Sequence, residues 1–392
     1  MATAKFLHAA DLHLGSPLKS LGDSVDPETV NFVKARVNTV FQRLVDVAVE
    51  EKVDFIVLAG DIYDMVDRDP GAQRRFLLGL RRLDESGIKV FMAHGNHDPF
   101  IRHIPRGLLP DNVVVFPPKK LLAETVVMSN GVEVTVAGVS YGKKDETDNL
   151  VPLFANLSGR TIVGVLHTNV GGNGEHDNYA PSTVAELDAS PVNYWALGHI
   201  HIRSVNPTRN GWWAYPGNLQ GRSVKAAECG PKGVLIVEVD DDGSIREPRF
   251  VECAAVRFER VEVSVDDIDD IALVNDAVND ALKTLVADGS GLPILVRLEL
   301  VGQTDLVELR SPTRESLEKL AADIREEASE VLGDGAIVKV RSSCTPRVDL
   351  VAERTRDTLL GNVLRALDGV EADHAVRDEA TKILVNVLGA GR

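Results

Sequence analysis

Short apolar runs rich in β-branched residues alternate with stretches of helical periodicity over the first 255 residues of the chain. Residues 27–52 carry apolar side chains at helical spacing, and residues 70–86 repeat this pattern between Pro70 and Gly87. The alternation predicts an α/β sandwich, with strands alternating with helices early and mainly strands later. The predicted strands are KFLH, DFIVLAG, IKVFMAH, NVVVF, VEVTVAG, TIVGVLH, NYWALGH, GWWAY and GVLIVEV.

The pattern changes near residue 255. Strand-like VRFERVEVSV, PILVRLELVG and AIVKVRSS are separated by helical stretches at about 266–287 and 312–331, which predicts a small βαβαβ unit with helices on one face. After Pro346 the chain reads as polar helices that are too short for a core of their own. We expect this tail to dock on the protein itself or on a partner. The predicted domains are therefore 1–254, 255–346 and 347–392.

Side chains that can bind metal ions follow five of the predicted strands. The carboxyl ends of strands are where sites form in α/β folds. Residues two apart in extended backbone point to the same side, so the pairs DLH and HIH can each reach one centre. Oxygen and nitrogen donors without cysteine suit Mn, Fe or Zn better than Ca. The candidate ligands are Asp11, His13, Asp61, Asn96, His167, His199 and His201.

Each of these motifs has an ordinary structural interpretation when it occurs alone. A DxH or HxH pair is common, and Gly-Asp after a strand is often only a turn. Their joint occurrence at strand ends favours one centre. Seven ligands are too many for a single four-coordinate ion. They suffice for two ions about 3.5 to 4 Å apart that share a carboxylate, the arrangement that holds both the attacking and the leaving oxygen of a phosphoryl group.

The series of motifs resembles the calcineurin-like metallophosphoesterases. The motifs are DLH (11–13), GDIYD (60–64), GNHD (95–98), LHT (166–168) and GHIH (198–201). The stretches HAADLHLGSPL, VLHTNVGG, YWALGHIH and YPGNLQGR are similar to SbcD-type DNA repair exonucleases, over residues 5 to about 240. Beyond residue 255 the resemblance is one of architecture. It implies a metallophosphoesterase β-sandwich flanked by helices, a small α+β capping domain, and a helical C-terminal tail that binds an SbcC-type coiled-coil ATPase.

The resemblance also implies roles for individual residues. Asp61 would bridge two divalent ions, with Mn favoured and Mg, Fe or Zn as alternatives. His97 would contact the scissile phosphate or protonate the leaving oxygen, and Asp98 would orient its ring. The two implied ligand sets are Asp11, His13, Asp61 and His201 for one ion, and Asp61, Asn96, His167 and His199 for the other.

One position departs from the pattern of the family. Asp64 stands where many double-strand-break nucleases of this family have a histidine. An acidic side chain there would repel phosphate unless it is paired or turned away from the substrate. Three further residues are candidate substrate contacts: His176 on a glycine-rich loop, Arg102, which could equally belong to a solvated helix face, and Arg222 at the end of YPGNLQGR.

Composition bounds the class of protein. The chain has 392 residues, of which 44% are hydrophobic and 26% charged, which indicates a globular protein of two or three domains. No stretch approaches the length of a membrane span, and MATAKFLHAADLHLG lacks the features of a secretory signal, so we expect a cytoplasmic protein. Three widely spaced cysteines without a CxxC pair fit a reducing compartment and argue against cysteine-bound zinc.

The net charge of −16 is awkward for a protein that holds nucleic acid, because phosphate contacts normally come from lysine and arginine. Residues 256–392 hold 17 basic and 27 acidic side chains, so −10 of this charge lies there. If DNA is bound, we expect the predicted domain at residues 1–254 or a partner to bind it.

The leading hypothesis is a metal-dependent DNA nuclease of DNA repair that hydrolyses DNA ends by two-metal in-line attack. No GxxxxGK[ST] phosphate loop is present, so an SbcC-type ATPase partner is implied by the resemblance. One alternative is a metallophosphoesterase of nucleotides or small phosphodiesters, and another is a catalytically weak scaffold that binds DNA ends. The sequence leaves open the physiological metal, exo against endo cleavage, the polarity, and whether the chain forms a homodimer.

Overall fold

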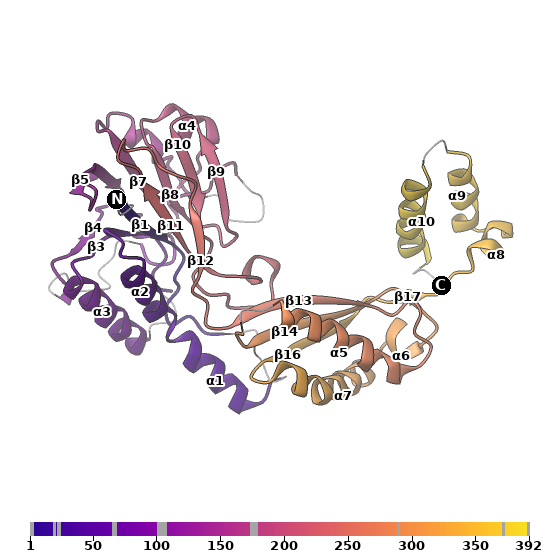
Figure 1. The fold of residues 1–392 in the computed structure, drawn as a ribbon. Helices are drawn as coiled ribbons and strands as arrows, with labels where there is room; N and C mark the ends of the chain where they lie inside the picture. The colour runs from indigo at the N-terminus through magenta and orange to yellow at the C-terminus, as the bar shows by residue number, and fades with distance from the viewer. Residues whose placement is uncertain are drawn as a thin grey trace. The chain divides into compact units, whose positions relative to one another are not determined.

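The computed structural model describes residues 4–18, 21, 25–64, 69–99, 108–172, 179–288, 291–370 and 373–389. The chain folds into two compact units (Figure 1). The first comprises the residues up to Leu21 and Val30–Phe258, and the second comprises Gly22–Thr29 and the residues from Glu259 onward. The predicted domain limits at 254 and 346 stay predictions. No helix in the described ranges combines the length and apolar character needed to cross a membrane.

The first unit contains two six-stranded sheets. The first sheet has the order β12-β11-β1-β2-β3-β4. Its strands β1 to β4 run parallel to one another, whereas β11 is antiparallel to both β1 and β12. The bounds are β1 Ala4–Ala9, β2 Phe55–Ala59, β3 Lys89–Ala93, β4 Val113–Val115, β11 Gly233–Val239 and β12 Arg249–Glu252.

The second sheet has the order β5-β6-β7-β8-β10-β9. The four central strands β6, β7, β8 and β10 are parallel, and the two edge strands are antiparallel to their neighbours. The bounds are β5 Leu122–Val127, β6 Glu133–Gly138, β7 Thr161–His167, β8 Tyr194–Gly198, β9 Ser204–Thr208 and β10 Gly211–Tyr215.

Apolar side chains from both sheets form the central core, and helices cover the two outer faces (Figure 1). Helices α2 (Val40–Glu50) and α3 (Pro70–Glu85) pack their buried residues on the first sheet. Helix α4 (Val184–Ala189) and the short 3-10 helix η3 (Val151–Phe154) pack on the second. Central strands such as β2, β7 and β8 are buried on both faces, which explains why they read as nearly continuous apolar runs.

Aromatic rings on neighbouring strands of the first sheet pack against one another in the core that both sheets share. Phe55 is fully buried, its ring lies 4.8 Å from that of Phe6, and Phe91 meets it edge to face at 5.8 Å. Phe55→Ala is expected to lower the free energy of unfolding by about 3 to 5 kcal/mol, because the change leaves a cavity in a close-packed core. Urea unfolding followed by tryptophan fluorescence measures this, since all three tryptophans lie in the first unit. Leu78→Ala, at a half-exposed position, is the control and should cost less than about 0.5 kcal/mol; an equal loss would contradict the prediction.

The helical stretch expected over 27–52 is two helices. Helix α1 covers Pro27–Val37, and α2 begins at Val40. Asn38 and Thr39 lie between them; their short polar side chains compete with the helical backbone, which favours an interruption. The Asn38 side chain accepts a hydrogen bond of 2.6 Å from Arg75 of α3, and this tertiary contact also stabilises the break between the two helices.

The second unit begins with an α+β layer. Strands β13, β14 and β16 form a sheet in that order, and α5 and α7 pack on it through a shared apolar cluster. Helices α8, α9 and α10 follow, with a small cluster of their own around Leu360, Leu364 and Val385. The predicted fold class is confirmed. The bounds are β13 Arg257–Ser264, α5 Ile271–Ala287, β14 Ile294–Val301, β15 Gln303–Thr304, α6 Val307–Arg310, α7 Arg314–Leu332, β16 Ala336–Ser342, β17 Thr345–Pro346, α8 Leu350–Thr355, α9 Leu359–Asp368 and α10 His374–Gly389.

Candidate metal centre

Loops at the carboxyl ends of five strands bring the seven predicted ligands together. Strands β1, β2 and β3 of the first sheet and β7 and β8 of the second supply them. Backbone hydrogen bonds join these loops: the Asp11 amide donates to the Gly60 carbonyl, and the His13 amide to the Asp61 carbonyl. Six of the seven predicted ligands are buried, and the His201 side chain is 15% exposed.

The backbone at the centre is strained. Asp11, His13, Asp61 and His199 have φ values of 51°, 43°, 53° and 108°, a region that residues with side chains rarely adopt. Such conformations persist when the surrounding structure enforces them, and they concentrate at functional sites. Four of the seven predicted ligands therefore have backbone conformations that cost local stability, as is typical of a functional site.

Glycines next to the ligands serve two different needs. Gly60 has a φ of 92°, as a left-handed turn requires. At Gly198 the need is space: a Cβ would lie 1.9 Å from the Ala59 carbonyl oxygen. The close approach of the two sheets at this position excludes any side chain.

His13 and His201 point the same ring nitrogen at one place. Their Nε2 atoms are 3.3 Å apart, while Nδ1 of His13 lies 3.1 Å from Asp64 and Nδ1 of His201 lies 2.8 Å from Glu228. A carboxylate only accepts, so each Nδ1 carries the proton and each Nε2 presents a lone pair. Two lone pairs facing each other repel unless a cation lies between them. This donor set fits a divalent metal ion.

Asp61 lies between two groups of donors. Its Oδ2 atom is 3.9 Å from His13 Nε2 and 3.4 Å from His167 Nε2. His167 donates from Nδ1 to the Ala59 carbonyl at 2.9 Å, which leaves Nε2 facing Asp61 and the Asn96 side-chain oxygen at 3.0 Å. These positions match a carboxylate that reaches ions on both sides.

Asp61 and His167 shift each other's protonation. Burial favours the neutral form of both groups, but the charge of Asp61 outweighs it and raises the pKa of His167 to about 9. The same contact, with His13 and His97, holds the pKa of Asp61 well below its usual range. A metal ion would take the place of the His167 proton, because imidazole binds metals only when that nitrogen is deprotonated.

Asp11 and His199 connect the two sheets. Both carboxylate oxygens of Asp11 accept from the His199 amide at 3.1 Å. The oxygens of Asp11 lie within 4.8 Å of ligand atoms of His13 and His201, and likewise of Asp61 and His167. The His199 ring stands 5.2 Å from the His167 ring, but no cluster of potential ligand atoms in the described ranges includes it. His199 as a ligand stays a prediction.

His97 is the exposed member of the site, with 44% of its side chain accessible. Its amide donates to Asp61 Oδ1 at 2.8 Å, and its Nδ1 atom lies 2.5 Å from Asp64 Oδ1. Burial opposes protonation of this ring, yet the contact with Asp64 prevails and raises the pKa of His97. A protonated, exposed imidazole beside the metal ligands can donate a proton to a leaving oxygen.

Asp98 does not orient the His97 ring, contrary to expectation. Its two oxygens accept from the backbone amides of Gly95 at 2.9 Å and Ile62 at 2.8 Å, and it lies 3.4 Å from His94. It is fully engaged in holding the turn after β3 against the turn after β2. Asp64 takes the role that the sequence assigned to Asp98, because the turn after β2 places its carboxylate nearer the ring.

Asp64 is paired on all sides, which removes the concern that it would repel phosphate. It contacts His13 and His97, and Arg222 donates to its Oδ2 atom at 3.2 Å. Burial would raise its pKa, but the hydrogen bonds from the two histidines lower it. Asp64 is therefore ionised over the working pH range and is turned toward cations of the protein.

Asp64→Asn is expected to move the alkaline limb of the pH–rate profile to lower pH. Rate falls as His97 loses its proton, and without the carboxylate the burial of the ring lowers the pKa of His97. We also expect a loss of about 10- to 100-fold at neutral pH, as for other residues that orient a ligand or catalytic group. Rates between pH 5 and pH 10 measure both effects. Asp46→Asn, in an exposed pair with Arg82, is the matched control, and an unmoved alkaline limb in Asp64→Asn would contradict the assignment.

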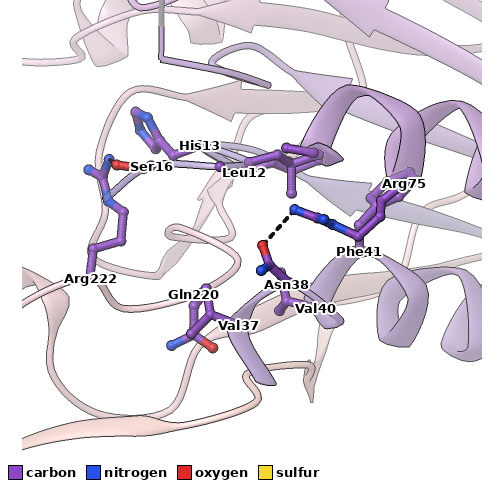
Figure 2. Close-up of a pocket in the computed structure, with 13 residues that line it drawn as sticks. Leu12, His13, Ser16, Val37, Asn38, Val40, Phe41, Arg75, Gln220 and Arg222 are labelled. Carbon is purple, nitrogen blue, oxygen red and sulfur yellow. Dashed lines mark hydrogen bonds between the residues drawn. The ribbon is translucent and has the colours of Figure 1, made fainter. Parts of the chain in front are cut away.

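The sequence did not indicate Glu228 as part of the site, nor that Arg222 pairs with Asp64 and Glu228. Glu228 is 7% exposed and contacts His201 and Arg222. Figure 2 shows the Arg222 guanidinium beside Ser16 and His13 at one side of a pocket, with Arg75 donating to Asn38 on the other. Arg222 was predicted to contact substrate; the structure gives its guanidinium protein partners. His176 and Arg102 lie outside the described residues.

The comparisons with known proteins agree with this geometry. Residues 4–203 match the family model described as calcineurin-like phosphoesterase, and residues 258–345 match the middle domain of metallophosphoesterase YhaO. The chain belongs to the calcineurin-like phosphoesterase family. This family binds divalent metals, so the protein is a metal-dependent hydrolase, and the His/Asp clusters described above are able to hold metal ions.

The chain is similar to proteins with two different names. An uncharacterized metallophosphoesterase YhaO from Bacillus subtilis is 33% identical over 83% of this chain and 78% of its own. DNA double-strand break repair proteins Mre11 are more distant. The protein from Sulfurisphaera tokodaii is 26% identical over 62% of this chain and 61% of its own, and that from Methanocaldococcus jannaschii is 27% identical over 70% and 72%.

Bound divalent ions would supply positive charge that stabilises a phosphoryl group as negative charge develops on it. The ligands present would hold them at the rim where both sheets end. An imidazolium at His97 can donate a proton, and Asp64 lies against its Nδ1 atom and raises its pKa. Most of the predicted ligands are buried, whereas His97 is exposed. A substrate would therefore reach the centre from the side on which His97 lies.

Proposed function

We propose that the protein is a metal-dependent nuclease of DNA repair that hydrolyses phosphodiester bonds at DNA ends, with two divalent ions, Mn favoured, bridged by Asp61. The position of Asp61 between His13 and His167 is the observation that carries this proposal, because one carboxylate then serves two ions. The exposed His97 suits a leaving group as poor as a sugar oxygen, which needs a proton.

The relatives support DNA as the substrate. Several of them are named DNA double-strand break repair protein Mre11, and the matches extend beyond the phosphoesterase unit, in one case over 94% of this chain. A protein with a net charge of −16 gains little attraction to DNA from its own field. We therefore propose that a partner contributes to DNA binding.

The C-terminal helices are the proposed contact with that partner, an SbcC-type coiled-coil ATPase. Helices α8, α9 and α10 enclose only a small apolar cluster. Val351 is 77% exposed, Leu359 68% and Ile383 55%, which is a large share for apolar side chains. Apolar residues at helix surfaces suit docking of another helix.

A second candidate is a metallophosphoesterase of nucleotides or other small phosphodiesters. The relative with 33% identity is named only as a metallophosphoesterase, and its name specifies no nucleic acid. The metal ligands serve both functions equally well. At the metal centre the two candidates differ in the substrate that binds beside His97.

Hydrolysis of end-labelled linear and hairpin DNA, beside bis(p-nitrophenyl) phosphate, tests the two candidates. Each substrate is incubated with Mn²⁺ and with chelator, using the wild type and Asp61→Ala as the background for contaminating nucleases. The nuclease proposal expects Mn²⁺-dependent DNA cleavage that the variant lacks. Cleavage of the small ester alone, even with an ATPase partner added, would favour the second candidate. Cleavage of neither would leave a DNA-end-binding scaffold as the better description.

A further inference from the structure

A buried carboxylate outside the predicted ligands organises one side of the metal centre. Glu228 ends the short 3-10 helix η4 (Ala226–Glu228) and is 7% exposed. Its Oε1 atom lies 2.8 Å from His201 Nδ1 and 3.4 Å from an Arg222 guanidinium nitrogen. Its Oε2 atom accepts from the Asn218 side chain and from the Arg222 amide, both at 2.9 Å. Both oxygens are thus surrounded by donors.

This arrangement determines which nitrogen of His201 is protonated. A carboxylate has no proton to give at neutral pH, so His201 must donate from Nδ1. The lone pair is then on Nε2, the atom that faces His13 Nε2 at 3.3 Å. A carboxylate behind a ligating histidine fixes ring orientation and tautomer, and strengthens the bond to the metal.

Two basic side chains hold this carboxylate and its histidine in place. Lys232, 5% exposed, donates to the His201 carbonyl at 2.7 Å and to the Ala227 carbonyl at 2.6 Å, so it ties the His201 loop to the turn that carries Glu228. Arg222 reaches Glu228 with one guanidinium nitrogen and Asp64 with the other, at 3.2 Å. Asp64 in turn contacts His13 Nδ1. One guanidinium therefore links the carboxylates behind two ligands.

We propose that Glu228 is a positioning residue of the metal centre that fixes the Nδ1–H form of His201, and that Arg222 joins it to Asp64 so that His201 and His13 are oriented together. The inference rests on the proposed two-ion site, because it assigns His201 to one ion only. It predicts that substitution of Glu228 lowers the affinity for one ion and leaves the affinity for the other unchanged.

Glu228→Gln is the sharpest variant because it keeps the size of the side chain. The Asn218 side chain and the Arg222 amide both need an acceptor, so the amide oxygen turns to them. The amide NH2 then faces His201 Nδ1, which must accept, and the imidazole proton moves to Nε2, where it blocks the metal. Glu252→Gln is the matched control, since Glu252 is likewise a partly buried carboxylate and is paired with Arg257.

The experiment titrates the full chain with Mn²⁺ alone, counting bound ions by electron paramagnetic resonance and calorimetry, with thermal unfolding measured in parallel. We expect two ions in the wild type and in Glu252→Gln. In Glu228→Gln one ion should bind about 10- to 100-fold more weakly, with the other ion and the thermal midpoint unchanged. Lys232→Met, which leaves the Glu228 carboxylate in place, should weaken the same ion by a smaller factor.

Unchanged affinity for both ions in Glu228→Gln would overturn the inference and leave the proposed function intact. Equal weakening of both ions together with a lower thermal midpoint would also overturn it, because Glu228 would then support the fold and not His201. A wild type that binds no Mn²⁺ would overturn the proposed function and this inference with it.

Discussion

Asp61→Ala is expected to lower phosphodiester hydrolysis by at least about 10³-fold. Stabilisation of the phosphoryl group by metal ions is worth several kcal/mol, and each 1.36 kcal/mol corresponds to a factor of ten. Asp61 Oδ2 lies between His13 and His167, so its removal takes a ligand from both sides of the centre at once. Its Oδ1 atom also fixes the His97 amide at 2.8 Å. Initial rates at saturating Mn²⁺ measure the loss.

A matched surface variant separates this effect from general damage. Asp46 lies on α2, is paired with Arg82 and is about half exposed. Asp46→Ala should retain wild-type activity, because surface pairs contribute little. Asp61→Ala should also bind fewer Mn²⁺ ions than the wild type. Retention of activity within about tenfold by Asp61→Ala would refute a bridging role for this carboxylate.

His97→Ala is expected to lower DNA hydrolysis by about 10² to 10⁴-fold, the usual contribution of a general acid. The effect should depend on the leaving group. A sugar oxygen leaves poorly without a proton, whereas p-nitrophenolate is a stable anion and needs none. The variant should therefore lose much less activity on bis(p-nitrophenyl) phosphate than on DNA. Parallel kcat measurements on both substrates give the ratio.

The same ratio distinguishes proton donation from a role in substrate binding. His94→Ala is the comparison variant, since His94 is also a histidine of the loop after β3 but lies 3.4 Å from Asp98 and not beside Asp64. It should not produce the dependence on leaving group. Equal losses on both substrates in His97→Ala would show that His97 contacts the phosphate and does not supply the proton.

Edge strands show what the sequence pattern misses. Strands β5, β9 and β12 were not predicted, and each lies at the edge of its sheet. Residues in β5 alternate between half-buried and exposed, so no continuous apolar run marks it. Central strands such as β7 are buried at every residue and were found. Local hydrophobicity reports burial, so an edge strand is recognised only where its own residues form an apolar run, as Val113–Val115 do in β4.

The sequence by itself determined the class of fold and predicted seven candidate ligands, because each candidate lies at the end of a buried strand or within four residues after it, and the pattern of burial is local. The tertiary structure decided which groups stand behind those ligands. It placed Asp64 and not Asp98 beside His97, and brought Glu228 to His201 across 27 positions of the chain. Contacts of this kind depend on how loops that are distant in the sequence meet at the ends of the strands, and no local pattern in the sequence contains that information.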